Sequence, residues 1–458
     1  MLKQLTKKLG LILIICALLL SFVGCGEVDP TVVGTVPEDK TISISIAVCG
    51  DVMAHMPQLE AAKKADGTYD FNRSFDYVRG IMSGVDLCMA NVECTFPGSG
   101  EYAGYPGFKT PDSMAEALAN AGVDVGLFAN NHMNDSGLAG ALRTAEVIRD
   151  YGMQTVGCRT SESDPRSIIV PIEKDGEVVK VGVVAYAYET SQGDTNRTMN
   201  GGAMKVDAPN YYNTFRQYAD LSVLDKDIEG IKNEIAWCKE NSDIVLVYLH
   251  WGEEYQRHSN ARQQYIAERL AEAAPDAIIA SHPHVLQEIA EVNGVPVYYS
   301  IGNYVSNQRE ETLDNHYTEQ GLIAMLNFDL TKSAVDDGKY VIDGFGEGAP
   351  IYGTPEEVAL EAEYNKKIFK FFSKAPEKSE VVWDSWSAWS KEGETAKAVP
   401  TWVNRYKEEG KTVYEIVPLI NGFEENAGLN FASYVGRAGN ALKEITELLG
   451  EEYIWNLK

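Results

Sequence analysis

Side chains able to bind metal ions occur in six short clusters, and each cluster follows a run of residues typical of a β-strand. The clusters are Asp51 with His55; Asn91 with Glu93; Asn130, Asn131 and His132; His250; His282 with His284; and Gly302 with Asn303. Oxygen donors and imidazole nitrogens of this kind are ligands of Mn, Fe and Zn ions. A lone histidine after a strand is more often structural, but the joint set favours a metal centre.

Two of the histidines, His282 and His284, are separated only by Pro283. Proline disfavours helical backbone in the residue before it, so an extended segment is expected here. We expect the two imidazoles to serve two different ions. A buried carboxylate between two cations is able to bridge them, because each cation pairs with its charge, and Glu93 is the candidate for that position.

The elements that would position these clusters alternate between strands and helices. Runs rich in Val, Ile and Tyr predict strands at residues 41–49, 85–89, 123–129, 179–187, 244–249, 277–280 and 295–299. Amphipathic patterns predict helices at residues 111–121, 137–151, 221–240 and 261–274. This alternation is typical of an α/β layered domain, here residues 41–330. Ligands of α/β sheets bind beyond the carboxyl ends of the strands, where the clusters lie.

The chain is strongly acidic, because 67 Asp and Glu against 40 Lys and Arg give a net charge of −27 over 458 residues. Such a surface repels phosphate backbones, so nucleic acid is excluded as a general partner. An anionic substrate would need a local positive centre, which a metal ion supplies. Five cysteines after the N-terminal segment lack metal-site spacing and are predicted to be small buried hydrophobes: Cys49, Cys88, Cys94, Cys158 and Cys238.

The first 24 residues resemble a bacterial lipoprotein signal peptide. Three lysines precede an apolar run at residues 9–20, which is shorter than the ~20 residues of a comfortable membrane span. The run leads to Gly24-Cys25, so we expect cleavage there and lipidation of Cys25. An uncleaved anchor helix is the alternative. Residues 25–40 would be a tether, and the protein would be extracytoplasmic and lipid-anchored to the bacterial cell membrane.

The polar clusters resemble, in order, the motif series of the CapA family of capsule-synthesis, poly-γ-glutamate biosynthesis proteins. The resemblance runs from about residue 43 to 308, and although each motif alone is weak, the six in series are specific. They are Gly50-Asp51-Val52-Met53, Asn91-Val92-Glu93, Asn130-Asn131-His132 with Asp135 and Gly137, His250-Trp251-Gly252-Glu253-Glu254-Tyr255, Ser281-His282-Pro283-His284-Val285 with Gln287, and Tyr299-Ser300-Ile301-Gly302-Asn303.

That family is similar to the calcineurin-like metallophosphoesterases, which implies an α/β fold of the four-layer α/β/β/α sandwich type and a site with two divalent metal ions, Mn, Fe or Zn. By motif, Asp51 corresponds to the carboxylate of the first metal. Glu93 matches the bridging carboxylate, although the superfamily commonly has aspartate there. The resemblance assigns the remaining ligands as follows: Asn131, His250 and His282 on the second metal, and His284 on the first.

The resemblance gives two further histidines other roles. His132 would contact the leaving group and donate a proton to it, so that His132 and Asp51 are the predicted catalytic residues. His55 fits less well, because the superfamily places its first histidine two residues after the aspartate rather than four. His55 is therefore either a displaced metal ligand or a nearby base.

Several other residues of the clusters are candidates for substrate contact: Asn91, Asn130, Trp251, Glu253, Tyr255 and Asn303. For the aromatic residues and Tyr304, core packing is an equally good interpretation. Glu253 and Glu254 either orient His250 or form a solvated acidic pair. The Gly302-Asn303 turn either presents backbone N–H groups to an anion or is a tight turn that needs glycine.

Residues 331–458 are predicted to form a C-terminal extension that packs on the main domain. Strands are expected at residues 339–343 and 399–405, and an amphipathic terminal helix at residues 433–450. Trp383, Trp386 and Trp389 recur every three residues, which would place them on one helical face. A packed face is favoured over a glycan- or partner-binding patch.

Taken together, the residues and the resemblance predict a membrane-anchored protein of capsule synthesis, export or anchoring that works as a metal-dependent hydrolase or transferase. Its expected partners are an anionic capsule polymer or its precursor, the membrane, and membrane capsule-synthase subunits. The alternative is a non-catalytic, polymer-binding export factor on the same fold. The complete ligand set, with His132 beside Asn131, favours the enzyme.

Overall fold

The computed structural model describes residues 38–335, 340–343, 380–383, 386–420 and 435–455. The chain divides into two compact units, of which the larger comprises Thr41–Thr331 and Ala388–Lys458 and the smaller Met1–Lys40 and Lys332–Ser387. All the candidate metal ligands belong to the larger unit. The signal peptide, the tether and Cys25 fall on or beyond the edge of the described residues, and the domain boundaries stay predictions.

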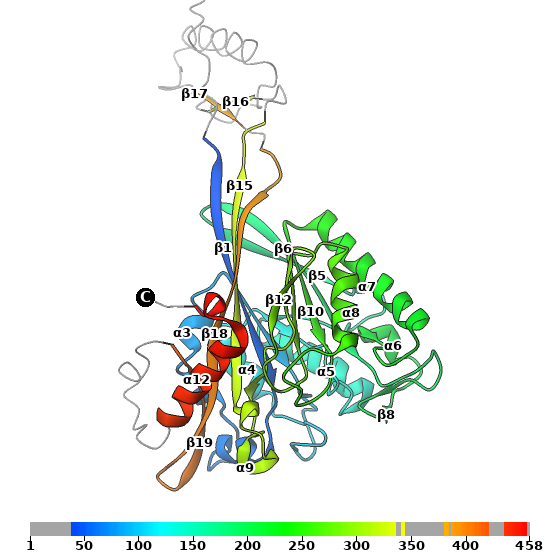
Figure 1. Ribbon diagram of the computed structural model, residues 1–458, viewed down its shortest axis with the longest axis vertical. Coiled ribbons are helices and arrows are strands. Elements are labelled where there is room, and N and C mark those ends of the chain that lie inside the picture. The colour runs from blue at the N-terminus through cyan, green and yellow to red at the C-terminus, as the bar shows by residue number, and fades with distance from the viewer. Residues whose placement is uncertain (1–37, 336–339, 344–379, 384–385, 421–434, 456–458) are drawn as a thin grey trace, which may run out of the picture. The chain divides into compact units, whose positions relative to one another are not determined.

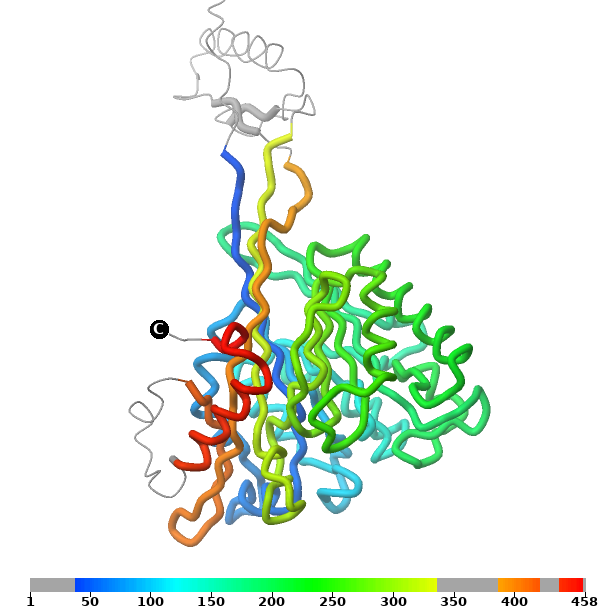
Figure 2. The backbone as a smooth tube through the Cα atoms, viewed as in Figure 1, coloured from blue at the N-terminus to red at the C-terminus, as the bar shows by residue number. Residues whose placement is uncertain are grey.

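The first sheet of the larger unit has eight strands, with the path β19-β18-β15-β1-β2-β3-β4 and β14 beside β1. Strands β1, β2, β3, β4 and β14 run parallel, so their carboxyl ends lie at one edge. Segments far apart in the sequence, β1, β15 and β18, lie side by side (Figure 2). The strands are β1 (Lys40–Val52), β2 (Leu87–Val92), β3 (Val125–Leu127), β4 (Gln154–Val156), β14 (Asn303–Val305), β15 (Gln320–Lys332), β18 (Ser390–Glu408) and β19 (Lys411–Pro418).

The second sheet has seven strands, with the path β12-β13-β11-β10-β6-β5 and β9 beside β6. Its centre, β6-β10-β11-β13, is parallel, and the pairs β5-β6 and β12-β13 are antiparallel hairpins. The strands are β5 (Ile168–Lys174), β6 (Glu177–Tyr188), β9 (Thr214–Phe215), β10 (Ile244–His250), β11 (Ala277–Ser281), β12 (Ile289–Val292) and β13 (Val295–Tyr298).

The sheets pack face to face, and helices cover their outer faces (Figure 1). Strand β10 shows why: Leu246 faces the core between the sheets, whereas its neighbours Val245 and Val247 face the helices, because side chains alternate along a strand. Four longer helices make the outer layers: α4 (Ser113–Ala121) and α5 (Gly137–Asp150) on the first sheet, and α7 (Leu221–Asn241) and α8 (Ala261–Ala271) on the second. The predicted four-layer α/β/β/α arrangement is confirmed.

The remaining described elements are short, apart from the terminal helix α12 (Val435–Leu449), whose Ile445 and Leu449 join the core of the larger unit. They are α2 (Met56–Ala62), η1 (Asn72–Phe75), α3 (Arg79–Met82), β7 (Thr198–Met199), β8 (Gly202–Ala203), α6 (Ala208–Tyr211), α9 (Glu310–Leu313), η2 (His316–Glu319) and η4 (Glu451–Tyr453), with β16 (Tyr340–Asp343) and β17 (Glu380–Trp383) in the smaller unit. Within the described residues no helix is both long and apolar enough to cross a membrane.

Most predicted elements are present with ends shifted by a few residues, and the five cysteines are free and buried as predicted. The prediction that three tryptophans share one helical face is wrong. Trp383 ends β17, Trp386 forms a β-bridge with Ala334, and Trp389 directly precedes β18. The three-residue spacing does not identify a helix here, because this segment forms backbone pairs with strands distant in sequence. A local sequence pattern does not record such pairs.

Candidate metal centre

The candidate ligands come from both sheets and meet at the carboxyl ends of their strands. The first sheet supplies Asp51 near the end of β1 and Glu93 just after β2. The second supplies His250 at the end of β10 and His282 just after β11. These four side chains are at most 2% exposed, so their polar atoms must find partners inside the protein.

A close approach between two backbone segments places Asp51. The N–H group of Asp51 donates to the carbonyl oxygen of Gly302 at 3.1 Å. A Cβ atom at Gly50 would lie 2.1 Å from that oxygen, so only glycine fits before Asp51. Gly302 itself has a φ of +68°, which favours glycine. The tight-turn interpretation of Gly302 is the one the backbone supports.

Asn91 is the hub of hydrogen bonds on the first sheet. Its amide nitrogen donates to Asp51 Oδ1 at 2.8 Å and lies 3.4 Å from Glu93 Oε2. Its amide oxygen accepts from the Asn130 side chain at 3.0 Å, and Asn130 also donates to the carbonyl of Val92 at 2.8 Å. Asn91 and Asn130, predicted as substrate contacts, are fully buried and hold the carboxylates in place.

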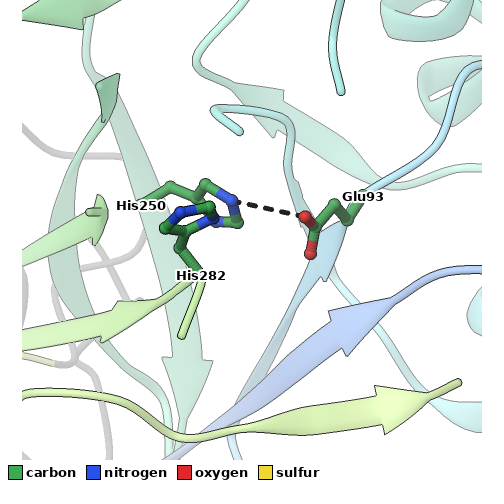
Figure 3. Close-up of side chains that lie close together, drawn as sticks. All are labelled: Glu93, His250 and His282. Atoms are coloured by element: carbon green, nitrogen blue, oxygen red, sulfur yellow. Dashed lines mark ion pairs between the residues drawn. The ribbon is translucent and has the colours of Figure 1, made fainter. Parts of the chain in front are cut away.

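Asn131 and His250 join the two sheets. The ring nitrogen Nε2 of His250 lies 3.0 Å from Asn131 Oδ1 and 3.3 Å from Glu93 Oε1. Figure 3 shows the His250 and His282 rings on one side, facing the Glu93 carboxylate on the other. Tyr188, the last residue of β6, stacks on His250 at 6.4 Å between ring centroids and lies 4.7 Å from the His282 ring.

His284 pairs with the other carboxylate. Its Nδ1 lies 3.1 Å from Asp51 Oδ2 and 3.1 Å from Asn303 Oδ1. The Asn303 amide nitrogen donates to the carbonyl oxygens of His284 and Thr318 at 3.2 and 2.9 Å. Asn303 therefore holds the backbone and the ring of His284 rather than standing open to a substrate.

An extended backbone was predicted for the segment of His282 and His284. Instead, both histidines have left-handed backbone, with φ of +105° and +57°. In a regular strand, side chains two residues apart share one face. The unusual backbone sends the two rings to different carboxylates, with their centroids 5.8 Å apart. Non-glycine residues with positive φ carry a strain that commonly marks a functional site.

Two groups of ligand atoms result, and they share Glu93. Glu93, His250 and His282 form one group, and Asp51, Glu93 and His284 form the other; within each, the ligand atoms lie within 4.8 Å of one another. Glu93 Oε1 and His282 Nδ1 are buried without a hydrogen-bond partner. Such atoms are rare in folded proteins unless an ion or water satisfies them. These residues therefore fit divalent metal ions.

Burial shifts the pKa values of the cluster, and the two histidines of the first group are shifted toward the metal-binding form. Burial raises the pKa of Glu93 well above its ordinary value, and the nearby Asp51 charge adds to this. Burial also opposes ionisation of Asp51, but the hydrogen bonds from His284 and Asn91 and the nearby histidines together outweigh it, so the pKa of Asp51 is lowered. Burial lowers the pKa of His250 to about 3 and that of His282 well below its usual range, so both rings are neutral at pH 7. Neutral imidazole is the metal-binding form.

His132 and His55 flank the cluster on either side of Phe108. Their rings lie 4.7 and 4.9 Å from the Phe108 ring in edge-on contacts. His132 Nδ1 lies 2.8 Å from Asp135 Oδ2, an arrangement that favours hydrogen on Nδ1 and leaves Nε2 to act. His55 Nδ1 accepts from the backbone N–H of Asn307 at 3.2 Å, and burial lowers its pKa to about 4. His55 is absent from both ligand groups.

The other residues predicted to contact substrate differ in how deeply they are buried. Trp251 is fully buried, stacks on Tyr299 and donates to its carbonyl at 3.0 Å, so its side chain packs in the core. Glu253 is exposed, in agreement with a solvated acid. Tyr255 is half-buried, with its ring 6.2 Å from that of His284. Sequence reasoning missed Tyr188; its only signal was its position directly after the predicted strand 179–187.

The chain matches the model of a known protein family. The family model described as "Bacterial capsule synthesis protein PGA_cap" matches residues 45–308, more than half of the chain. The chain belongs to this family. The matched region contains all six candidate metal ligands, and the resemblance to capsule-synthesis proteins inferred from the motifs is confirmed.

Named relatives are also similar to this PGA_cap protein. The PGA biosynthesis protein CapA of Bacillus subtilis (strain 168) is 29% identical over 64% of this chain and 71% of its own length. The capsule biosynthesis protein CapA of Bacillus anthracis is 29% identical over 43% of each chain. A probable polyglutamine synthesis accessory protein of Mycobacterium tuberculosis, Rv0574c, is 25% identical over 54% of this chain and 62% of its own.

Two solved structures are similar at low sequence identity. GAP50, titled the anchor in the inner membrane complex of Plasmodium, is 11% identical, with a TM-score of 0.30 over 68% of this chain and 87% of its own. TT1561 of Thermus thermophilus is 12% identical, with a TM-score of 0.35 over 62% of this chain and 94% of its own.

Proposed function

We propose that this chain is a metal-dependent hydrolase or transferase of capsule synthesis, acting on poly-γ-glutamate, a related anionic polymer or its precursor. The observation that carries the proposal is the pair of buried ligand groups that share Glu93, in which polar atoms of Glu93 and His282 lack other partners. The relatives' names, which include PGA biosynthesis and capsule biosynthesis, support the class of substrate.

Each group around the centre has a chemical role in this proposal. Asp51, Glu93, Asn131, His250, His282 and His284 would hold two divalent ions, which polarise the oxygen at the reacting bond and lower the pKa of the attacking water or hydroxyl. Asn91 keeps Asp51 in position through its 2.8 Å hydrogen bond. Asp135 keeps a proton on His132 Nδ1, so that protonated His132 delivers its Nε2 proton to the leaving oxygen or nitrogen.

We further propose that Cys25 carries a lipid that anchors the protein outside the cytoplasm on the bacterial membrane. Support comes from the lysines, apolar run and Gly24-Cys25 of the N-terminal segment. On the membrane the protein would meet the growing polymer and the synthase subunits that make it. Mass spectrometry of the protein purified from membranes should show acylated Cys25 as its first residue; an intact N-terminus would refute this part of the proposal.

Metal analysis combined with a substrate panel tests the enzymatic proposal. We expect the purified protein to contain divalent metal and to turn over phosphoester or γ-glutamyl substrates, and chelation to abolish turnover. His132→Ala should lower kcat by ~10²–10⁴-fold, the usual contribution of an acid–base group. The matched control is His258→Ala, because the His258 side chain is 80% exposed.

Other outcomes separate the enzyme from a non-catalytic protein. Bound metal without turnover of any substrate would favour the polymer-binding export factor. Turnover that is unchanged in His132→Ala would contradict the proton-donor role. In both cases the assignment of the metal ligands would be unaffected, because metal content is measured independently.

A further inference from the structure

A cavity of about 270 Å³ lies beside the end of β4, and three arginines line it: Arg149, Arg159 and Arg166. They come from separate segments, the end of α5, the loop after β4 and the approach to β5. This gathering of positive charge is unusual for a chain in which acidic residues outnumber basic ones by 67 to 40. Its lining contains one acidic residue, Asp164.

The three guanidinium groups form no ion pair with the part of the chain that the structure describes. Among the residues that the structure describes, none of them has a carboxylate oxygen within 4.0 Å. The Asp164 carboxylate accepts instead from Thr160 Oγ1 and from the backbone N–H of Ser161, both at 3.0 Å. By contrast, Arg143, Arg197 and Arg216 elsewhere in the unit each pair with a carboxylate.

Within the described segments, the hydrogen bonds of these arginines go to neutral oxygens. Arg149 donates to Thr160 Oγ1 at 2.7 Å. Arg159 donates to backbone carbonyls, including that of Asp164 at 2.8 Å, and its Nε is buried without a partner. Arg166 donates to the Tyr212 carbonyl at 2.9 Å. Burial and the charge of Arg166 lower the pKa of Arg159, and the more distant Asp164 and Glu162 offset this only in part.

The cavity lies at the same edge of the first sheet as the candidate metal centre. Val156 at the end of β4 pairs with Leu127 at the end of β3, and the turn after β3 carries Asn131. Gly157, in the cavity lining, touches that turn so closely that a Cβ atom there would lie 2.6 Å from Ala129 Cβ. A polymer bound at the metal centre would therefore have this cavity beside it along the sheet edge.

We propose that this arginine cavity is a subsite that binds carboxylate groups of an anionic polymer whose reacting bond lies at the metal centre. The inference rests on the proposed function for the position of that bond. The planar guanidinium fork matches a carboxylate through two parallel hydrogen bonds, which lysine does not reproduce. Poly-γ-glutamate carries one free carboxylate per residue, so a segment of it supplies the repeated negative groups that three arginines would bind.

The test measures binding of a γ-linked glutamate oligomer of about ten residues to the full-length protein by titration calorimetry. The comparison probes are the same oligomer with its carboxylates amidated, and inorganic phosphate. We expect Arg149→Gln to weaken binding of the acidic oligomer about tenfold or more, the size expected for a hydrogen bond between charged groups. We expect the amidated oligomer to bind far more weakly, and added salt to weaken the acidic one.

Variants are chosen so that loss of folding is not mistaken for loss of binding. Arg149 is exposed and contacts Thr160, so Arg149→Gln should keep the thermal midpoint, whereas Arg166→Gln removes support for Tyr212 and is the second variant. Arg269→Gln is the control, because it removes one positive charge at a partly exposed helix position already paired with Glu272. It should bind the oligomer as the unmodified protein does.

The outcomes distinguish the subsite from the proposed function. Binding that depends on the arginines, without turnover of any substrate, would keep the subsite and refute the enzyme. Turnover of small substrates, with oligomer binding unchanged in Arg149→Gln and Arg166→Gln, would keep the enzyme and refute the subsite. Equal binding of the acidic and amidated oligomers, or arginine-dependent binding of phosphate but not of the oligomer, would also overturn it.

Discussion

The two sheets contribute unlike halves to the candidate metal centre. The first sheet supplies Asp51, Glu93 and Asn131, the charged and amide ligands, and the second supplies the imidazoles of His250, His282 and His284. The first half is held by a dense set of amide hydrogen bonds centred on Asn91. The second half relies on ring contacts with Tyr188 and on positive-φ backbone at His282 and His284.

The difference follows from the cost of burying charge. A carboxylate without donors is expensive inside a protein, so the half that carries the charge also carries the donors. The neutral rings of His250 and His282 need fewer partners, and contacts with Tyr188 help to orient them. The His284 ring, in contrast, is held by Asp51 and Asn303. Glu93 is the exception, because its Oε1 faces the other half and has no hydrogen-bond partner of its own. Binding a metal ion would complete its coordination.

The largest expected effect comes from Glu93→Gln, which keeps the size of the side chain and removes the charge shared by both ligand groups. We expect metal content to fall from about two ions per chain to below one. Turnover should fall by more than the 10–100-fold loss that is typical when a residue hydrogen-bonded to a metal ligand is replaced. The metal-free variant should be at least as stable as the unmodified protein at pH 7, because the raised pKa of Glu93 makes folding unfavourable above the pKa of the unfolded carboxyl group, and glutamine removes that cost.

Elemental mass spectrometry and urea unfolding check this prediction, with Glu291→Gln as the control because Glu291 is an exposed strand residue. Full metal content and full turnover in Glu93→Gln would show that the two halves do not share a ligand.

A pair of histidine variants sharpens the comparison inside the imidazole half. His282→Ala should remove the ion held with His250, and His284→Ala the ion held with Asp51, so each should lose about one equivalent of metal per chain. Elemental analysis of the two variants side by side measures this. If one variant kept all its metal and the other lost all of it, a single ion site would replace the pair.

The smallest effect is expected from Asn91→Ala, which leaves the ligands in place and removes the hub of the charged half. The variant should be destabilised by about 1–3 kcal/mol, since Asp51 loses a donor and Asn130 an acceptor in a buried site. Urea unfolding of the metal-free protein gives the number, with exposed Asn120→Ala as the reference. A change as small as that of the reference would mean that packing alone positions the carboxylates.

Much of this arrangement was predictable from local patterns. The runs at residues 41–49 and 244–249 have the composition of buried strands, and Asp51 and His250 stand at their ends in both the sequence and the structure. The order of the motifs also indicated the family. Strand β15 was missed although most of its residues are apolar and buried. The β18-β19 pair was cut short because the polar first half of β18 is recognised as a strand mainly by its distant partners.

What the sequence by itself determined is the set of chemical groups and the strand ends that carry them, because side-chain type and alternation are local properties. Tertiary structure alone decided which groups meet. It paired Asp51 with His284 and Glu93 with His250. It also placed Arg149, Arg159 and Arg166 around one cavity. Such meetings depend on sheet order and on backbone strain at His282 and His284, and both are set by contacts between residues far apart in the chain.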